Sequence, residues 1–512
     1  MFKGHPKGLY ALALANTGER FGYYTMIAVF ALFLRANFGL EPGTAGTIYS
    51  TFLALVYFLP LIGGILADKF GFGRMVTIGI LIMFFGYLLL SLPLGSGTVA
   101  LLGMMAALLL ISFGTGMFKG NLQVMVGDLY NDPKYADKRD SGFSIFYMAI
   151  NIGALFAPTA ALAIKKWAEN SLGFSGNDAY HFSFAVACIS LILSIAIYYA
   201  FRKTFIHVEG GAKKDKKEVK AATEDNLTPQ QTKSRMVALF MVFGVVIFFW
   251  MAFHQNGLSL TYFADEFTAQ SADGILGMSF NVWNLVAIIF IVYGLFSVFQ
   301  SSTSKAKWTS CGVVAAAVGF LVWQYTRISS PVEVNAPIFQ QFNPFYVVAL
   351  TPVSLAIFGA LAKKGKEPSA PRKIAYGMLV AASAYALMLF FSIGLPVPQT
   401  VTGPDGNPVA VHVADVTPNL LIGTYLILTF GELLLSPMGI SFVSKVAPPK
   451  YKGMMMGCWF VATAIGNFLV QVGGLLWGKT PLWVVWAVFL ALCLISAAFM
   501  FAMMKKLEAA TK

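Results

Sequence analysis

The sequence predicts an all-α membrane protein of fourteen transmembrane helices. Hydrophobic residues occupy 57% of the 512 positions and charged residues only 12%, whereas a soluble protein carries about 25% charged residues. Apolar runs of roughly 20 residues recur from end to end, and each is long enough to cross a bilayer core of about 30 Å. The runs are long and unbroken, which favours helices over the short alternating strands of a β-barrel.

Six of the predicted spans precede a polar segment and eight follow it. The first six are 9–36, 43–68, 75–94, 98–127, 140–166 and 180–203. The other eight are 235–264, 276–302, 306–327, 337–362, 372–395, 418–444, 451–477 and 481–505. Because the number of spans is even, both termini are expected on the same side of the membrane.

Basic residues gather in alternate loops, which accounts for the net charge of +13 without a nucleic-acid partner. The loops on the side of the termini carry Lys69, Arg74, Lys134, Lys138, Arg139, KKDKK at 213–217, Lys305, Lys307, KKGK at 363–366, Arg372, Lys373, Lys445, Lys450 and Lys452. The opposite loops carry few, among them Lys165, Lys166, Arg327 and Lys479. This positive-inside pattern predicts a multi-pass protein of the plasma (inner) membrane with both termini in the cytoplasm.

The polar segment 204–234 has mixed charge and is interpreted as a cytoplasmic linker between two helical bundles. The N-terminal bundle is expected at 1–203, the C-terminal bundle at 235–505 and a cytoplasmic tail at 506–512. Spans 276–302 and 306–327 hold almost no ionisable residue at mid-membrane depth, so they are expected to form an added hairpin that faces lipid. Without that hairpin the chain is six spans plus six, the layout of two repeats with a central site between them.

Enzymatic and metal chemistry find no support in the sequence. The cysteines, which are Cys188, Cys311, Cys458 and Cys493, all fall within apolar runs and lack metal-ligand spacing. No HExxH, GxSxG, Walker A or CxxC motif is present. The basic start is followed by an apolar run that lacks a cleavage site and is long enough to span, so no cleavable signal peptide is expected. We therefore expect no enzyme and no cofactor, and the absence of a soluble domain also disfavours a sensor.

Charged residues inside a span are costly, so each is a candidate functional residue. The candidates are Glu19, Arg20, Lys119, His254 and Glu432, with Asn151 and Asn343 as uncharged polar groups. One face of the first span carries Asn16, Arg20, Tyr23, Tyr24 and Ile27 at helical spacing. Glu19 lies about 100° around the helix from Arg20, and adjacent residues do not face each other. Glu19 is therefore expected to pair with Lys119 on another helix, either in a functional network or as a purely structural ion pair.

The other candidates each keep a structural alternative. Lys119 lies in GTGMFKGNLQ, whose glycines permit close helix approach, but a lysine there could also extend to the inner interface. His254 is placed to carry a proton or, equally, to donate one neutral helix-to-helix hydrogen bond. Glu432 precedes the helix-kinking Pro437 and suits a cationic ligand group, the alternative being a structural acid. In the loop GGILADKFGFGR, Asp68 and Arg74 could form gating ion pairs, or they could merely set topology.

These motifs resemble a known family. GGILADKFGFGR (63–74) resembles the loop between the second and third helices of the major facilitator superfamily. GERFGYY (18–24) resembles the E-x-x-E-R-F-x-Y-Y motif of the proton-dependent oligopeptide transporter family, and FSIFYMAINIGALFAP (143–158) its fifth-helix signature. FQQFNP (339–344), GELLLSPMGISFVSKVAP (431–448) and the W-F…G-N of 459–467 resemble its eighth, tenth and eleventh helices.

The resemblance implies the major facilitator fold and a symporter that imports di- and tripeptides with protons. Glu432 would hold the peptide amino group, and Arg20 and Lys119 would meet its carboxylate. Tyr23, Tyr57, Asn151, Asn343 and Trp459 would line the pocket, and Glu19 would take part in proton-linked ion pairs.

The sequence also departs from the family pattern. The motif's first glutamate falls at Asn16, a frequent arginine falls at Ile27 and the seventh-helix acid falls at His254. Lys119 is followed by Gly120 where the family usually has proline, and the hairpin follows the seventh span instead of the sixth. Glu19 and His254 thus remain the obvious proton-coupling candidates besides Glu432. A peptide carrier without proton coupling and a carrier of nitrate or another small anion stay open as alternatives.

Overall fold

The computed structural model describes residues 4–210, 227–328, 331–403, 408–448 and 451–510. Within these residues, fourteen helical segments are long and apolar enough to cross a membrane, as the sequence predicts. The first six are α1 (Lys7–Phe38), α2 (Pro42–Phe70), α3 (Phe72–Leu90), α4 (Thr98–Asp128), α5 (Arg139–Leu172) and α6 (Ala179–Ala200). Short 3-10 turns, η1 (Ala136–Lys138), η2 (Arg202–Thr204) and η3 (Ile206–Val208), precede α5 and follow α6.

The second part of the chain has eight spans, two of which are broken. Its helices are α8 (Pro229–Phe253), η4 (His254–Gly257), α9 (Ser259–Glu266), α10 (Gly274–Met278), α11 (Val282–Gln300), α12 (Ser304–Arg327), η5 (Ala336–Gln341), α13 (Phe342–Lys363), α14 (Ala370–Ser392), α15 (Asn419–Val446), α16 (Lys452–Phe468), α17 (Gln471–Leu476) and α18 (Leu482–Ala509). Two small antiparallel pairs, β1 (Ser271–Ala272) with β2 (Val332–Glu333) and β3 (Thr400–Thr402) with β4 (Pro408–Ala410), complete the described elements.

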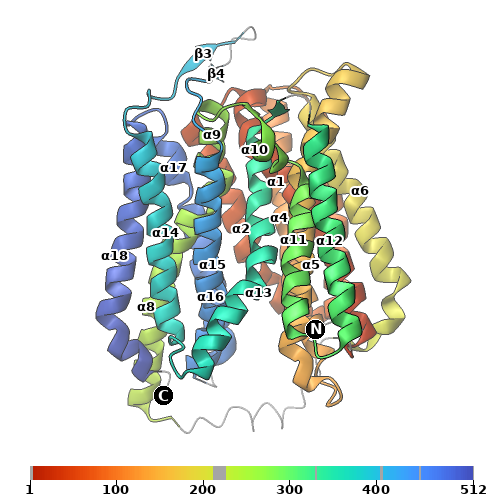
Figure 1. The fold of residues 1–512 in the computed structure, drawn as a ribbon, viewed down its shortest axis with the longest axis vertical. Coiled ribbons are helices and arrows are strands. Elements are labelled where there is room, and N and C mark those ends of the chain that lie inside the picture. The colour runs from red at the N-terminus through yellow and green to blue at the C-terminus, as the bar shows by residue number, and fades with distance from the viewer. Residues whose placement is uncertain (1–3, 211–226, 329–330, 404–407, 449–450, 511–512) are drawn as a thin grey trace.

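The helices lie roughly parallel in two groups side by side (Figure 1). Helices α1–α6 pack against one another, and α8 and α13–α18 form the other group. Both termini lie at one end of the bundle, here called the termini end, and β3–β4 lies at the other, the strand end (Figure 1). The ribbons of the two groups diverge toward the termini end.

Helices α11 and α12 form the predicted hairpin. Helix α11 packs on α12 and on α13, whereas Ser310 and Ala317 are the buried residues of α12. Large apolar side chains on α12, including Trp308, Val322 and Trp323, are exposed. Such a surface is stable in hydrocarbon, which is consistent with the expected lipid-facing position.

Glycines set how closely the first helices approach one another. A Cβ at Gly63 of α2 would lie 2.1 Å from the carbonyl oxygen of Gly116 on α4. A Cβ at Gly114 would lie 2.5 Å from the carbonyl oxygen of Gly79 on α3. The glycines of GTGMFKG on α4 therefore allow the backbones of α2 and α3 to pack closely against α4. Helix α4 itself is continuous through these glycines.

Two helices extend past the boundaries predicted for the linker and the tail. Helix α8 already begins at Pro229, because Thr228 and Gln231 form a capping box there, so 229–234 belongs to a helix and not to the linker. Helix α18 continues to Ala509, so most of the predicted tail is helical. The basic cluster at 213–217 lies outside the described residues.

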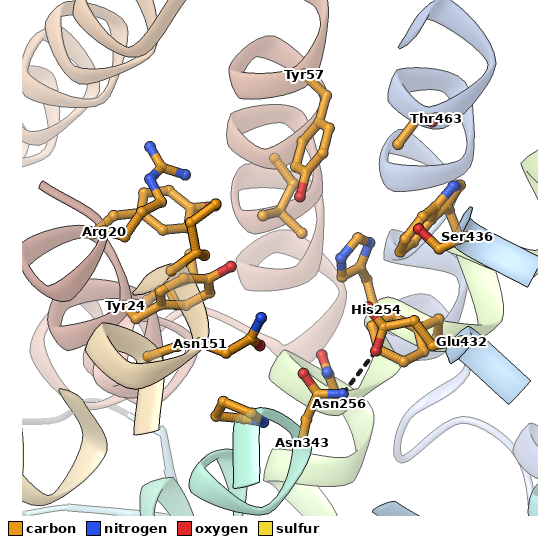
Figure 2. Close-up of a pocket in the computed structure, with 18 of the residues that line it drawn as sticks. Arg20, Tyr24, Tyr57, Asn151, His254, Asn256, Asn343, Glu432, Ser436 and Thr463 are labelled. Carbon is orange, nitrogen blue, oxygen red and sulfur yellow. Dashed lines mark hydrogen bonds between the residues drawn. The ribbon is translucent and has the colours of Figure 1, made fainter. Parts of the chain in front are cut away.

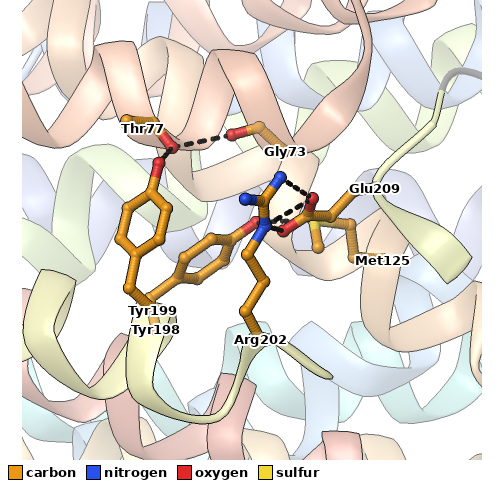
Figure 3. A network of polar contacts seen from close by, with 7 residues as sticks. All are labelled: Gly73, Thr77, Met125, Tyr198, Tyr199, Arg202 and Glu209. Atoms are coloured by element: carbon orange, nitrogen blue, oxygen red, sulfur yellow. Dashed lines mark hydrogen bonds and ion pairs between the residues drawn. The ribbon is translucent and has the colours of Figure 1, made fainter. Parts of the chain in front are cut away.

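The start of the linker is anchored to the loop motif 63–74 (Figure 3). Glu209 accepts hydrogen bonds from Arg202 and from the Tyr198 hydroxyl, which is 2.9 Å away. Its backbone oxygen accepts from the N–H of Gly73 at the start of α3, 3.0 Å away. The hydrogen bond and charge of Glu209 raise the pKa of Arg202. These contacts join α6, the linker start and the N-terminus of α3.

The seventh span is broken at HQNG, a feature that the sequence analysis did not predict. The freed backbone carbonyls find side-chain donors, as a helix break at membrane depth requires. The Tyr425 hydroxyl lies 2.8 Å from the carbonyl oxygen of Asn256, and Tyr385 donates to that of Ala252. A Cβ at Gly257 would lie 1.8 Å from the Tyr49 hydroxyl, so the break also needs a glycine at this position.

A buried ion pair joins the two groups of helices at the strand end. Arg35 of α1 donates to Glu266 of α9 at 2.5 Å, and the side chains are 8% and 1% exposed. The Trp477 indole N–H donates to the same carboxylate at 3.1 Å. The Arg35 guanidinium also lies 4.6 Å from the ring centroid of Tyr262. This cluster fixes α1 against the second group in the present conformation.

Candidate functional site

A cavity of about 260 Å³ lies between the two groups of helices (Figure 2). From the first group it is lined by residues of α1, α2, α4 and α5, among them Arg20, Tyr23, Tyr57, Lys119 and Asn151. From the second it is lined by residues of α8, η4, α13, α15 and α16, among them His254, Asn343, Glu432 and Trp459. The structure thus brings together nearly every pocket residue that the sequence singles out.

Glu432 is 8% exposed and projects into the cavity from α15. The Asn343 side chain donates to its Oε2 at 3.0 Å and also donates to Thr429 at 3.0 Å. Tyr147 of α5 donates to its Oε1 at 3.4 Å, across the boundary between the two groups. Helix α15 continues through Pro437 without interruption. No ion pair involves Glu432 among the described residues, so its carboxylate remains available to a cation.

The expected pairing of Glu19 with Lys119 is wrong. Glu19 pairs with its own neighbour, Arg20, through two hydrogen bonds of 2.5 Å, and both residues are buried. Adjacent helix positions do point apart, but the long arginine side chain can fold back until its planar fork meets the carboxylate. The Arg20 guanidinium also lies 4.7 Å from the Tyr23 ring centroid. The pair is therefore nearly neutral as a unit.

Lys119 faces the cavity without an ion-pair partner in the described part of the chain. Its Nζ lies 3.9 Å from the centroid of the Tyr57 ring, a cation–π contact. Because Lys119 is part of the cavity lining, the alternative of a lysine extending to the interface does not describe this conformation. Among the described residues, Lys119 and Glu432 are thus two opposite charges on the cavity wall that form no ion pair.

His254 lies at the start of the break in the seventh span and points into the cavity (Figure 2). Its Nδ1 is 2.6 Å from Oδ1 of Asn467 on α16. The imidazole stacks on Trp250 with centroids 5.0 Å apart and an interplanar angle of 19°. The centroid of the Tyr57 ring lies 6.0 Å from that of the imidazole, with an interplanar angle of 51°. Both sequence-based interpretations, a proton carrier and a helix-to-helix hydrogen bond, are compatible with this geometry.

The uncharged pocket residues are held firmly. Asn151 donates to the Tyr147 carbonyl at 3.0 Å, and Tyr23 stacks on Phe52. The Trp459 ring lies directly on Gly439 of α15, where an added Cβ would be 1.9 Å from the ring. The glycine of the SPMG motif therefore makes room for an aromatic cavity wall.

The sequence analysis missed several residues of the site and both residues of the strand-end ion pair. Tyr147 lies within the fifth-helix motif that was recognised, so the motif itself was a usable signal. Asn467 is the last residue of the W-F…G-N motif, but its contact with His254 depends on packing between helices. Arg35 and Glu266 lie near the ends of their spans, where charges are common and carry little signal.

The proposed gate residues are exposed in this conformation. Asp68 and Arg74 both lie at the surface, and neither forms an ion pair with a described residue. The backbone of the same loop is instead held through Gly73 and Glu209. A gating role for Asp68 and Arg74 stays a prediction.

The arrangement of charges in the cavity is suited to binding a small molecule. The cavity presents a carboxylate and an ammonium on opposite walls, with amide and aromatic groups between them. Such a surface complements a small zwitterion. A search of the described residues finds no group of three or more His, Cys, Asp or Glu side chains that could hold a metal ion.

Family comparison agrees with the motifs. A model of the POT family matches residues 73–223 and 317–476, more than half of the chain. The chain belongs to the POT family. Members named among its relatives and structural neighbours are transporters, so the chain is a member of a transporter family.

Relatives of the chain align with it over most of their length. The chain is 29% identical to an uncharacterized transporter, YclF, of Bacillus subtilis, over 93% of this chain and 89% of that protein. It is 29% identical to the peptide transporter YePEPT of Yersinia enterocolitica, over 92% of this chain and 88% of that protein. It is 27% identical to dipeptide and tripeptide permease A of Escherichia coli, over 91% of this chain and 83% of that protein.

Solved POT structures share the fold. A peptide transporter POT in complex with sulfate superposes with a TM-score of 0.72 at 23% identity, covering 100% of this chain and 96% of that chain. A POT family transporter in complex with 5-aminolevulinic acid gives a TM-score of 0.73 at 21% identity, covering 100% and 98%. The predicted major facilitator fold is thereby confirmed.

Proposed function

We propose that the protein imports di- and tripeptides together with protons by alternating access. The observation that carries this proposal is one cavity with Glu432 on one wall and Lys119 on the other. The ammonium and carboxylate ends of a peptide need oppositely charged partners in the pocket. Glu432 and Lys119 can serve as these partners, because neither forms an ion pair with another described residue. Relatives named as peptide transporters support the same substrate class.

The binding mode follows from the hydrogen bonds around each charge. Glu432, oriented by Asn343, holds the peptide ammonium. Lys119 meets the carboxylate, with Arg20 on the same side of the cavity, although in this conformation Arg20 is engaged by Glu19. Tyr23, Tyr57, Asn151 and Trp459 line the space between the two ends. A carboxylate such as Glu432 in the cavity disfavours nitrate as the substrate, because it repels an anion.

Alternating access would consist of rocking between an N-terminal bundle of six helices and a C-terminal bundle that carries the inserted hairpin. The Arg35–Glu266 pair closes the strand end here, and it would separate in the opposite state. The concentration of basic residues on loops of the termini end supports a cytoplasmic position for that end in a plasma membrane protein. The present conformation is then the inward-facing one, with the linker on the cytoplasmic side.

Proton coupling would use Glu19 or His254. Protonation of Glu19 would release Arg20 toward the substrate, since the carboxylate could no longer hold the guanidinium in a bidentate pair. His254 can gain a proton directly from the cavity that it lines. Asp68 and Arg74 would act in gating at the cytoplasmic end.

The test is uptake of labelled dialanine into proteoliposomes, with and without an inward proton gradient, and with unlabelled peptides or nitrate as competitors. Concentrative uptake only under the gradient supports symport, whereas uptake that merely equilibrates identifies an uncoupled peptide carrier. No peptide uptake overturns the substrate assignment.

Replacement of Glu432 tests the proposed contact with the peptide ammonium directly. Glu432→Gln keeps the hydrogen-bonding shape but removes the charge, so dialanine affinity is expected to fall by at least about tenfold, the equivalent of one lost charge-assisted contact of roughly 1.5–3 kcal/mol. Glu41→Gln is the matched control, because Glu41 is exposed at the strand end. Unchanged dialanine affinity in Glu432→Gln would remove the main support for the proposal.

A further inference from the structure

His254 is held by a neighbour that determines which ring nitrogen faces the cavity. Its Nδ1 lies 2.6 Å from Oδ1 of Asn467, which is 0% exposed. The ring also stacks on Trp250, and the tilted Tyr57 ring lies with its centroid 6.0 Å from that of the imidazole. These three contacts leave Nε2 on the cavity lining, and among the described residues it makes no hydrogen bond.

The amide oxygen of Asn467 determines which nitrogen of the His254 ring carries the hydrogen in the neutral form. Because Oδ1 can only accept, Nδ1 carries the hydrogen in the neutral ring and Nε2 keeps its lone pair. The same oxygen remains a suitable acceptor after Nε2 gains a proton, since both nitrogens of imidazolium are donors. Asn467 therefore supports His254 in both charge states, with the exchangeable position open to the cavity.

Among the described residues of the cavity lining and their ion-pair partners, the charges around His254 come from three other elements, α4, α1 and α15. Lys119 of α4 is a cation that interacts electrostatically with His254, and its Nζ lies 3.9 Å from the centroid of the Tyr57 ring. On α1 the charges of Arg20 and Glu19 balance each other. Helix α15 contributes Glu432, which is engaged by Asn343 and Tyr147. The remaining titratable groups of the cavity are tyrosines, namely Tyr23, Tyr24, Tyr49, Tyr57 and Tyr147, and the α16 residues Thr463 and Asn467 do not titrate.

We propose that Asn467 is a positioning residue that presents His254 Nε2 to the cavity, and that the transported proton binds there cooperatively with the substrate carboxylate. This inference rests on the proposed function. A second positive charge beside Lys119 is unfavourable while the cavity is empty. The peptide carboxylate offsets that repulsion, so peptide and proton each strengthen the binding of the other by the same factor.

The cycle balances in protons. Nε2 accepts one proton from the outer solution as the peptide binds, and the resulting imidazolium and Lys119 hold the carboxylate together. When the peptide leaves on the other side, the repulsion from Lys119 returns and the proton is released to that side. The ring and Asn467 then regain their starting state.

The first experiment measures dialanine binding to purified protein in nanodiscs as a function of pH. Asn467→Asp places a negative acceptor on Nδ1, so the pH at which affinity is half-maximal is expected to rise by about one unit. Asn467→Ser, which removes the amide acceptor, is expected to shift it downward. Asn419→Asp is the control, because Asn419 is exposed at the start of α15, and it should leave the midpoint unchanged.

A double variant separates positioning from general structural damage. In a His254→Gln background, Asn467→Asp should no longer move the midpoint, since the group that titrates is absent. A shift that persists in that background overturns the proposal, as does an unchanged midpoint in both single Asn467 variants. Wild-type binding of dialanine amide, which lacks the carboxylate, should lose most of its pH dependence, and retention of the full dependence contradicts cooperative binding.

The experiment distinguishes failure of the proposed peptide transport from failure of the role assigned to Asn467. If wild-type protein binds no dialanine at any pH, the peptide assignment falls and this inference falls with it. If wild-type protein binds and transports dialanine but the Asn467 variants keep the wild-type midpoint, the role of Asn467 alone is overturned.

Discussion

At the scale of single residues, the cavity is shaped as much by glycines as by charges. Gly439 and Gly257 each lie against an aromatic side chain, Trp459 and Tyr49, at distances that leave no room for a Cβ. The glycines are therefore part of the site, although they contribute no functional group. Gly439 lies seven residues after Glu432 on the same helix, and Gly257 ends the HQNG segment that begins with His254.

Gly439→Ala is expected to impair transport by displacing the Trp459 ring. The added Cβ would lie 1.9 Å from a ring that is only 3% exposed, so the ring must shift into the cavity. We expect uptake efficiency for dialanine to fall by about ten- to a hundredfold, as for a misplacement of roughly 1 Å in a binding site. Kinetics of uptake in proteoliposomes measure this effect.

Gly244→Ala provides the control for that substitution. Gly244 lies within α8, and an added Cβ there meets nothing within 4 Å. This variant should transport like the wild type and be slightly more stable, because alanine favours helix over glycine by about 1 kcal/mol. Equal behaviour of the two variants would contradict the steric argument.

At the scale of elements, small polar contacts fasten the loops to the helices. The segment after β4 is held through His412, whose Nε2 lies 3.0 Å from Asp415 and whose Nδ1 lies 3.1 Å from the Asp265 carbonyl oxygen. Partial burial alone would lower the pKa of His412, but the hydrogen bonds to Asp415 and Asp265 outweigh it and the pKa is raised. Protonated His412 therefore stabilises this segment.

The pH dependence of that contact has a definite sign. Because the pKa of His412 is higher in the folded protein than its ordinary value, the stabilisation is complete below about pH 6.5 and is lost as the pH rises through the folded value. Asp415→Asn is expected to lower the pKa of His412. Histidine NMR titration in nanodiscs measures it, and an unchanged pKa in Asp415→Asn would show that the ion pair is absent.

At the scale of the whole molecule, the two groups of helices are joined by a buried charge pair at one end. Arg35→Met is expected to destabilise this conformation by about 3–5 kcal/mol, because it leaves Glu266 buried without its cation. Arg35→Met combined with Glu266→Leu should recover much of that loss. Thermal unfolding in detergent and distance measurements across the strand end report stability and closure separately.

The exposed pair between Lys166 and Glu333 is the control for the buried one. Its side chains are 62% and 58% exposed, so Lys166→Met should change stability by about 0–1 kcal/mol. The hydrogen bonds from Lys166 and Asn335 lower the pKa of Glu333, which is outside the spans and remains solvated. If Arg35→Met were as mild as Lys166→Met, the Arg35 pair would not be holding the groups together.

The sequence by itself determined the spans, the fold class and the identity of the charged cavity residues. The apolar runs are dictated by the bilayer, since each must be long enough to cross it and must satisfy its own backbone. Arg20, Lys119, His254 and Glu432 stood out because charges within such runs are rare. The sequence also contains the capping-box residues Thr228 and Gln231, which mark the start of α8.

Only the tertiary structure decided which of these residues touch. Glu19 folds onto Arg20 and leaves Lys119 unpaired, because side-chain length and not helix angle sets the contact. His254 meets Asn467, and Arg35 meets Glu266, across more than two hundred positions of sequence. Such contacts depend on how separate helices pack, and helical periodicity defines the faces of each helix but not their partners.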